Sequence, residues 1–467
     1  MTKKQTLKAL LEISEGGKIL FLGKEGIFTD KESRRFLKKF KLSLTREYEE
    51  DVCGVIEHHR LNPLEEEISN RVYDAGIPLY TLHSFEKLLS EEINDDELLM
   101  GIKLSNDQER ILRLLGNEHL SHTLFVKLLK MYRFHEEEED NRHDRDVIMY
   151  TLRRYIKINP NEEDLLYSYL TLRRLATEAT DPQLLLALVG FPDFEFMVRG
   201  KERMTLRETI ARNPQLDEVL IAKLLALRNS KVDRALASNT SVSPEVLNIL
   251  FAKKSREMNK ALATNSRLDE VLFAQLLACD PSVVALLLVW QPISLSRLER
   301  IEHTVVDERL FALLGANEHL DAEVVEKLLF KENQALKSAL CGNPVVKEET
   351  LRTLFEENSK ETFDALAQNP ATPLDILQTL YREYPEDITL LKALAHNPSV
   401  PQEILEALFE RENLEINRGL ATNASLPQRL LESLKIDTRL QHELAQNEHL
   451  ANSYEAVLKQ QKVMLNI

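Results

Sequence analysis

Residues 394–405 read Leu-Ala-His-Asn-Pro-Ser-Val-Pro-Gln-Glu-Ile-Leu, and the first four of these residues form a phrase that recurs along the chain. The phrase is an aliphatic residue, usually a small residue, any residue and then an amide, which we call the anchor of its repeat. The ten anchors are Asn213, Asn239, Asn265, Gln291, Asn317, Asn343, Asn369, Asn397, Asn423 and Asn447. Seven of the nine intervals between them are 26 residues, and the other two are 28 and 24. Such a period predicts a stacked array of one supersecondary unit.

Each repeat has the pattern of two helices joined by a turn at the anchor. The aliphatic and small residues before the anchor fit the last turn of a first helix. The anchor Asn is expected to end that helix in the left-handed conformation, often followed by a proline such as Pro398. An apolar residue three positions later, such as Val400, is expected to fill the groove between the helices. Apolar residues seven, eight, eleven and twelve positions after the anchor give the second helix one apolar stripe, so each repeat needs its neighbours.

The stretch 394–405 resembles the leucine-rich repeat variant family, a bacterial helical relative of the HEAT and armadillo repeats. No alternating strand pattern occurs in the unit, which excludes a leucine-rich-repeat horseshoe. The resemblance implies a mainly α protein, a right-handed α-solenoid of ~26-residue repeats. Some family members carry an iron–sulfur segment, but the three cysteines here are scattered, so no cofactor is expected. We interpret Cys341, in a small-residue position of its repeat, as a packing residue.

Composition limits the class of protein further. A chain of 467 residues, 43% hydrophobic and 29% charged, fits a folded protein with an extended array and one small domain. The unpatterned cysteines and the absence of a recognisable signal peptide predict a cytoplasmic location. The formal charge of −16 argues against general nucleic-acid binding. The apolar stretch 271–293 is broken by Asp280-Pro281, so we interpret it as part of the array and not as a membrane span.

Residues 1–92 differ from the rest and are predicted to form a small α/β domain with a parallel sheet. The predicted strands are 18–22, 42–46, 52–56 and 77–81, and the predicted helices are 31–40, 63–75 and one that begins at 84–89. This order, with the phrase 75–80 (AGIPLY) before 85–89 (FEKLL), resembles a BRCT domain, although the usual glycine pair and tryptophan are missing. The resemblance makes Gly23 and Lys24 candidates for a phosphate site. The acidic helix start at Glu65, however, favours plain protein docking over phosphopeptide binding.

Residues 93–203 are predicted to be divergent helical repeats, and residues 204–467 the regular array. Asn117 and Asn159 are further anchors, and Phe191-Pro192 is interpreted as a degenerate one. An acidic insertion at about 134–145 is interpreted as a solvated loop; contact with a basic partner and metal binding are the alternatives.

Other polar and aromatic residues give weaker signals. His119, His319 and His449 occupy one position of the repeat and are expected to serve the turn. The pair His58-His59 follows a predicted strand and is a minor site candidate. The sole tryptophan, Trp290, is expected to be buried at a slight kink, with an exposed binding hot spot as the alternative. No catalytic motif, phosphate loop or metal-ligand spacing is present, so the protein is not expected to be an enzyme.

The leading hypothesis is therefore a non-enzymatic scaffold or adaptor. Its helical repeats would present an extended surface to a protein partner with a basic patch or helix, and the BRCT-like module would supply a second contact. The alternative is a nucleic-acid protein of the DNA-repair type, which would use a local group of basic residues. These residues are Arg212, Lys223, Lys231, Arg234, Lys253, Lys254, Arg256 and Lys260.

Overall fold

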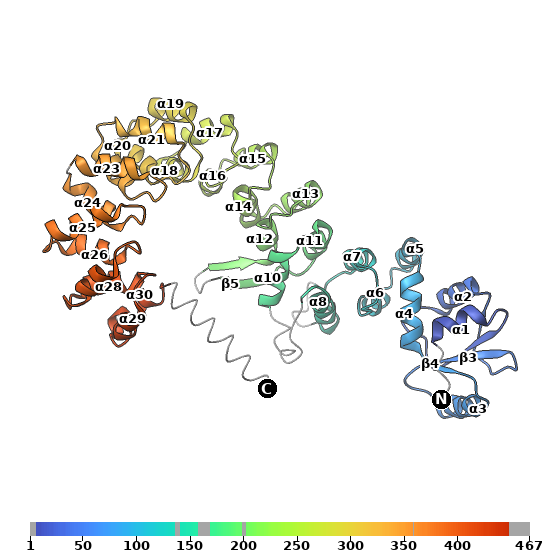
Figure 1. The fold of residues 1–467 in the computed structure, drawn as a ribbon. Coiled ribbons are helices and arrows are strands. Elements are labelled where there is room, and N and C mark those ends of the chain that lie inside the picture. Colours follow the sequence, from blue (N-terminus) through green and yellow to red (C-terminus); the bar gives the residue numbers. More distant parts are fainter. Residues whose placement is uncertain (1–5, 136–140, 157–168, 199–201, 358, 448–467) are drawn as a thin grey trace. The chain divides into compact units, whose positions relative to one another are not determined.

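The computed structural model describes residues 6–135, 141–156, 169–198, 202–357 and 359–447. The protein is mainly α-helical and contains one small parallel sheet (Figure 1). The chain divides into two compact units, residues 1–236 and 237–467, which are described separately below.

The first unit begins with an α/β domain. Its four strands are all parallel in the order β2-β1-β3-β4, and Ile19 of β1 lies opposite Leu44 and Gly54. The elements are α1 (Leu7–Ile13), β1 (Lys18–Leu22), α2 (Asp30–Lys39), β2 (Ser43–Thr45), β3 (Val52–Glu57), α3 (Pro63–Asp74), β4 (Leu79–Thr81) and α4 (Leu82–Glu92). Every predicted strand and helix is present, and the structure adds α1, which was not predicted. The unbroken apolar run of β1 is explained by its central place in a parallel sheet, whose strands are covered on both faces.

The described residues in the remainder of the first unit form helices and one hairpin. The elements are α5 (Asp95–Ser105), α6 (Gln108–Leu115), α7 (His122–Met131), α8 (Arg142–Tyr155), α10 (Tyr169–Glu178), α11 (Pro182–Leu188), β5 (Glu195–Val198), β6 (Glu202–Thr205), α12 (Leu206–Ala211), α13 (Glu218–Ala226) and α14 (Ser230–Ser238). The antiparallel pair β5–β6 was not predicted, because residues 93–203 were expected to be helical throughout. Phe196 and Met204 face each other in this pair and are buried, which explains why the segment is extended.

The second unit is built from pairs of short helices. Its elements are α15 (Pro244–Phe251), α16 (Arg256–Ala263), α17 (Glu270–Leu277), α18 (Pro281–Trp290), α19 (Leu295–Thr304), α20 (Glu308–Ala312), the 3-10 helix η2 (Leu313–Ala316), α21 (Ala322–Leu329), α22 (Gln334–Cys341), α23 (Glu348–Glu356), α24 (Lys360–Gln368), α25 (Leu374–Glu383), α26 (Ile388–His396), α27 (Gln402–Phe409), α28 (Leu414–Thr422), α29 (Gln428–Leu434), the 3-10 helix η3 (Thr438–Leu440) and α30 (Gln441–Leu444). We call the helix that precedes each anchor the first helix of its repeat and the helix that follows it the second helix.

First helices pack on first helices along the second unit. Contacts join α16 to α18, α22 to α24, α24 to α26, α26 to α28, and α28 to α30. The aliphatic residue three positions before each anchor is buried, as Leu366, Leu394 and Leu420 show. The predicted stripe of the second helix is buried too, for example at Leu405 and Leu408. None of the helices in the described ranges combines the length and apolar character that a bilayer crossing requires.

The close approach of α28 to α26 depends on a glycine. A Cβ atom on Gly419 of α28 would lie 2.6 Å from the Lys392 carbonyl oxygen and 3.0 Å from the Ala395 Cβ on α26. These contacts are shorter than van der Waals distances, so a side chain at this position must separate the helices. Gly342 provides a matched comparison, because a Cβ there would find its nearest neighbour at 3.7 Å.

We predict that Gly419→Ala destabilises the protein by about 1–3 kcal/mol through overpacking. Gly342→Ala is expected to leave stability unchanged or to raise it slightly. Urea denaturation followed by far-UV circular dichroism measures both variants. Equal midpoints for Gly419→Ala and the wild type would contradict the packing argument.

Candidate functional site

The anchor amides hold successive repeats together. Asn397 is fully buried, and its Nδ2 donates to the carbonyl oxygens of Ala367 and Asn369, both at 2.8 Å. Its Oδ1 accepts from the backbone amide of Ser399 at 2.8 Å. One side chain therefore provides hydrogen bonds to carbonyl groups at the end of the preceding first helix and to an amide of its own turn. These are backbone groups that have no partner within a helix.

The same donor pattern, from the side-chain amide to two backbone carbonyls of the preceding repeat, recurs through the second unit. It is found at Asn265, Gln291, Asn317, Asn343, Asn369, Asn397, Asn423 and Asn447, which we call the amide ladder. Asn239 has the acceptor half of the pattern, because its Oδ1 accepts from the Ser241 amide at 2.8 Å.

Related contacts occur in the first unit. Asn213 Nδ2 donates to the carbonyl oxygens of Ala176 at 2.9 Å and Ala179 at 3.0 Å. The turn that precedes the Asn213 repeat is therefore the one after α10, and the interpretation of Phe191-Pro192 as an anchor was wrong. Phe191 instead follows α11 and leads into the β5–β6 hairpin. Asn117 Nδ2 donates to Ser90 Oγ on α4 at 2.8 Å, and Asn159 lies outside the described residues.

The backbone of the anchors differs from the prediction. Asn317, Asn369, Asn397 and Asn423 have φ between −73° and −78° and extended ψ, so they are not left-handed. The extended backbone accompanies a side chain that reaches back to the preceding repeat and still accepts from the residue two positions ahead. Left-handed residues occur fifteen positions after three anchors, beyond the ends of second helices. They are Arg228, Lys254 and Glu412.

The Gln291 repeat is irregular. Gln291 Nε2 reaches the carbonyl oxygens of Ala263 and Asn265 at 2.8 Å, as predicted for an amide in this position. Its Oε1 is buried without a hydrogen bond within the described residues, because the Ile293 amide donates to the His319 carbonyl oxygen at 3.3 Å instead. Arg297 braces this turn by donating to the carbonyl oxygens of Pro292 at 2.9 Å and Leu268 at 3.0 Å.

The histidine position after the anchor acts through its backbone. The amides of His119 and His319 donate to Oδ1 of Asn117 at 2.9 Å and of Asn317 at 2.6 Å, which closes the turn. His449 lies outside the described residues. Cys341, interpreted as a packing residue, is fully buried, and burial raises the pKa of its thiol to about 12, so this thiol remains protonated at neutral pH.

A polar groove with a volume of about 650 Å³ lies on the first-helix face of the second unit. Most of the residues that line it occupy the positions five, four and one before an anchor, which we call the groove positions. The lining residues at these positions are Ser338, Asp364, Ala365, Gln368, Lys392, Ala393, His396, Arg418, Gly419, Thr422, His442, Glu443 and Gln446. The position four before the anchor is Ala or Gly in the three middle repeats of the groove, so no large side chain fills the groove there. The positions five and one before the anchor vary in charge and size.

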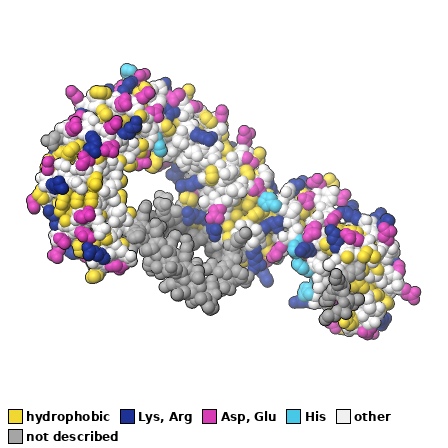
Figure 2. All heavy atoms as spheres, in the orientation of Figure 1, with side chains coloured by type: hydrophobic (Ala, Val, Ile, Leu, Met, Phe, Trp, Pro, Cys, Tyr) yellow, Lys and Arg dark blue, Asp and Glu magenta, His cyan; other side chains and the backbone are white. Residues whose placement is uncertain are grey.

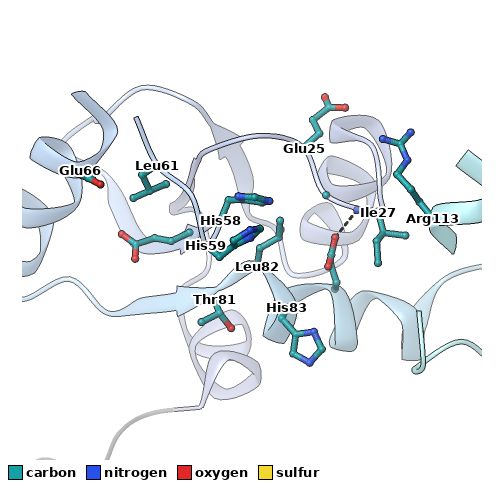
Figure 3. A pocket seen from close by; sticks show the side chains of 13 residues that line it. Glu25, Ile27, His58, His59, Leu61, Glu66, Thr81, Leu82, His83 and Arg113 are labelled. Carbon is teal, nitrogen blue, oxygen red and sulfur yellow. Dashed lines mark hydrogen bonds between the residues drawn. The ribbon is translucent and has the colours of Figure 1, made fainter. Parts of the chain in front are cut away.

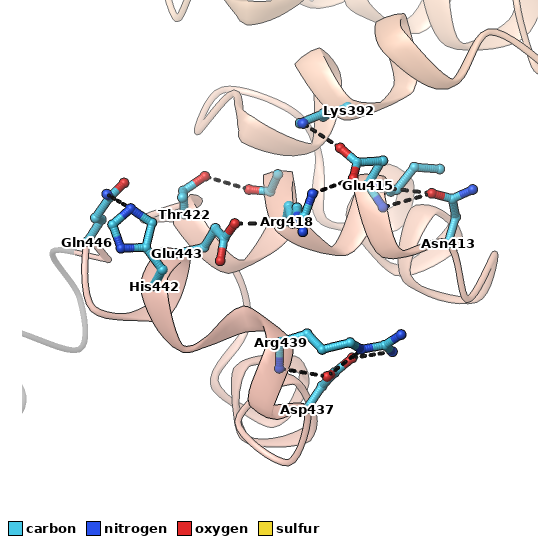
Figure 4. Close-up of polar contacts among 12 residues, drawn as sticks. Lys392, Asn413, Glu415, Arg418, Thr422, Asp437, Arg439, His442, Glu443 and Gln446 are labelled. Carbon is cyan, nitrogen blue, oxygen red and sulfur yellow. Dashed lines mark hydrogen bonds and ion pairs between the residues drawn. The ribbon is translucent and has the colours of Figure 1, made fainter.

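Ion pairs cross between the helices of the groove (Figure 4). Lys392 Nζ lies 2.7 Å from Glu415, and Arg418 lies 2.5 Å from Glu415 and 3.5 Å from Glu443. The hydrogen bond from Lys392, together with the charges of Lys392 and Arg418, lowers the pKa of Glu415. The cations of Lys392 and Arg418 are thus compensated by carboxylates of the protein itself.

Trp290 is exposed, with 52% of its surface accessible, so the prediction that it is buried was wrong. It occupies the groove position one before Gln291, as His396 and Thr422 do before their anchors. The apolar face of α18 that is buried contains Val283, Leu287 and Leu288, and the indole is left outside the core.

A second pocket, with a volume of about 890 Å³, lies at the carboxyl ends of β3 and β4 (Figure 3). It is lined by His58, His59, His83 and Glu86, among others, and Arg113 contributes from α6. Burial raises the pKa of Glu86, whose Oε1 accepts from the Ile27 amide at 2.6 Å.

The phosphate-site candidates border this region. The Gly23 amide donates to Glu65 Oε1 at 3.0 Å, and Glu65 Oε2 accepts from the Asn62 amide at 2.9 Å as part of the α3 capping box. A carboxylate of the chain therefore occupies the Gly23 amide donor. Lys24 lies beside a small cavity of about 10 Å³ together with Asp30 and Arg46.

Within the described residues no group of three or more His, Cys, Asp or Glu side chains could hold a metal ion. The central part of the acidic insertion, residues 136–140, lies outside the described residues; at its edge His135 Nδ1 lies 3.1 Å from Asp144 Oδ1. Comparison with protein-family models, curated proteins and solved structures gives no match for this chain.

The amide ladder leads to a direct test at Asn397. Asn397→Ala removes two donated hydrogen bonds, leaves the carbonyl oxygens of Ala367 and Asn369 without this buried donor, and removes the acceptor of the Ser399 amide. We therefore expect a loss of about 2–4 kcal/mol of stability. Asn397→Asp keeps the shape but directs a negative charge at two carbonyl oxygens, so the loss is expected to be at least as large.

Gln402, exposed on the second helix α27, is the control position for this test. Gln402→Ala is expected to change the urea midpoint little, because surface substitutions of this kind usually have small effects. The ladder would lose its assigned role if Asn397→Ala and Gln402→Ala unfolded at the same urea concentration.

Proposed function

We propose that this protein is a non-enzymatic scaffold whose helical repeats form an α-solenoid of the leucine-rich repeat variant type and bind a protein segment along the first-helix face. The observation that carries the proposal is the groove of about 650 Å³, whose lining repeats from one helix pair to the next. A surface with one contact set per repeat suits an elongated partner better than a compact small molecule.

The difference between the buried positions and the groove positions of each repeat supports this proposal. Buried positions, such as Leu394 and Asn397, are kept similar from repeat to repeat, while the neighbouring groove positions change from Asp364 to Lys392 to Arg418. Variation at exposed positions on a constant framework allows recognition of a particular sequence without loss of the fold.

The α/β domain supports a second protein contact in the same proposal. It has the β2-β1-β3-β4 parallel order and a pocket at the carboxyl ends of its strands. Because Glu65 already accepts from the Gly23 amide, we propose that this BRCT-like module docks on protein without requiring a phosphate group.

Charge distribution weighs against the nucleic-acid alternative. On the face shown in Figure 2, acidic and basic side chains are interspersed over the helices, and the whole chain carries −16. The local basic residues belong to several elements: Lys223 lies on α13, Lys253 and Lys254 follow α15, and Lys260 lies on α16. An electrophoretic shift with DNA that weakens as salt is raised would favour the alternative over the scaffold.

Site-specific photo-crosslinking tests the proposed face. A benzophenone amino acid replaces Gln368 or Thr422, which are groove positions, or Gln402, an exposed glutamine on a second helix, in the cells that produce the protein. We expect Gln368 to cross-link to one partner, identified by mass spectrometry of the linked peptide, and Gln402 to give no such product. Cross-links that are equal at both positions, or absent from Gln368 and Thr422 alike, would refute binding along this face.

A further inference from the structure

The first-helix face of the second unit changes character along its length. The groove positions five and one before Gln291 and Asn317 are apolar: Leu286, Trp290, Ala312 and Ala316. Trp290 is half exposed there, and its helix α18 carries no charged residue. The corresponding positions from Asn369 onward are polar or charged. A partner that runs along this face therefore meets an aromatic residue first and charged residues three repeats later.

One charge in the groove lacks a counter-ion. Lys392 and Arg418 are paired with Glu415 and Glu443, whereas Asp364 on α24 has no ion-pair partner within the described part of the chain. The nearby Lys360 forms its ion pair with Asp387, with Nζ 3.2 Å from Oδ2. Partial burial and the Asp387 charge raise the pKa of the Asp364 carboxyl, and the Lys360 charge offsets part of this effect.

We propose that the partner segment places a lysine or arginine against Asp364 and an apolar side chain against Trp290. This inference rests on the proposed function, because it names the chemistry of the partner on the same face. A cation at Asp364 completes the charge pairing of the groove, and an apolar contact covers the exposed indole. Ala365, which lines the groove beside Asp364, and Gly342, on which a Cβ would lie 3.8 Å from the Ala365 Cβ, leave room for the long side chain that must reach the carboxylate.

The repeat spacing fixes the length of that segment. Trp290 and Asp364 belong to repeats whose anchors, Gln291 and Asn369, are three steps apart. First helices that pack at roughly 8–10 Å per step separate the two sites by roughly 24–30 Å. A helical partner would need about 16–20 residues to span this distance at about 1.5 Å per residue.

Trp290 is the only tryptophan, so its fluorescence reports directly on contact. The probe is a 20-residue helical peptide without tryptophan. Its exposed positions toward one end are leucines, and those toward the other end are arginines. A matched peptide carries glutamate in place of arginine. We expect the arginine peptide to shift the emission of the full-length protein to shorter wavelength and the glutamate peptide to bind at least tenfold more weakly.

Variants then separate the two contacts, with fluorescence anisotropy of labelled peptide as the readout. Asp364→Asn is expected to weaken binding of the arginine peptide about fivefold, and Trp290→Ala at least as much. Glu349→Gln, at an exposed carboxylate on the second helix α23, is expected to leave the affinity unchanged.

The outcomes distinguish this inference from the proposed function. If Gln368 cross-links to a partner but Asp364→Asn does not weaken the arginine peptide, the scaffold function stands and the inference is wrong. Equal affinities for the arginine and glutamate peptides, or no binding of the arginine peptide, also overturn it. If Asp364→Asn weakens binding but neither Gln368 nor Thr422 gives cross-links in cells, the site chemistry is supported and the scaffold function fails.

Discussion

The second unit depends on one interaction, the bond from each anchor amide to two carbonyl oxygens of the repeat before it. The carbonyls at the end of a short first helix have no partner within that helix, and in a packed array they are shielded from water. A carboxamide supplies two N–H groups for them and an oxygen for the following turn, which is what Asn397 does with Ala367, Asn369 and Ser399. The helices are short and gain little stability alone, so this bond and apolar packing must fix their positions.

This constraint explains which length changes the chain tolerates. The interval between Asn369 and Asn397 is 28 residues, yet the Nδ2 of Asn397 still reaches the Asn369 carbonyl oxygen at 2.8 Å. The additional residues are accommodated in α25 and the loop before α26, away from the anchors. The shorter interval before Asn447 is met by the 3-10 helix η3 and the brief α30, and the Asn447 bonds are kept. Such a loop tolerates a change of length better than the packed anchors do, although Pro385 in this loop still accepts a hydrogen bond from Arg411 of the next repeat.

Much of this arrangement could be predicted from the sequence, and the failures have physical causes. The strands of the α/β domain and the buried leucines follow from apolar patterns that only one secondary structure can bury. The prediction of a left-handed backbone at the anchor Asn was wrong. Residue preferences at helix ends describe an isolated helix, whereas here the preceding repeat holds the Asn side chain through hydrogen bonds. Trp290 was misplaced because α18 is apolar all round, so periodicity does not indicate its exposed side. The register would have indicated it, since the residue before most anchors is polar, as at His396 and Thr422.

The groove could not be read from composition because its residues are far apart in sequence and share only their distance from an anchor. Its charges also depend on contacts that spacing alone does not give: Glu415 sits on α28 and neutralises Lys392 on the preceding first helix. Once those pairs are assigned, the groove is no longer a mixture of charges, and Asp364 remains as the uncompensated one within the described residues. The cations of this groove are paired with carboxylates of the protein, whereas the Asp364 carboxylate, three repeats from the exposed indole of Trp290, is not paired within the described residues. This arrangement suits a basic segment with an apolar end.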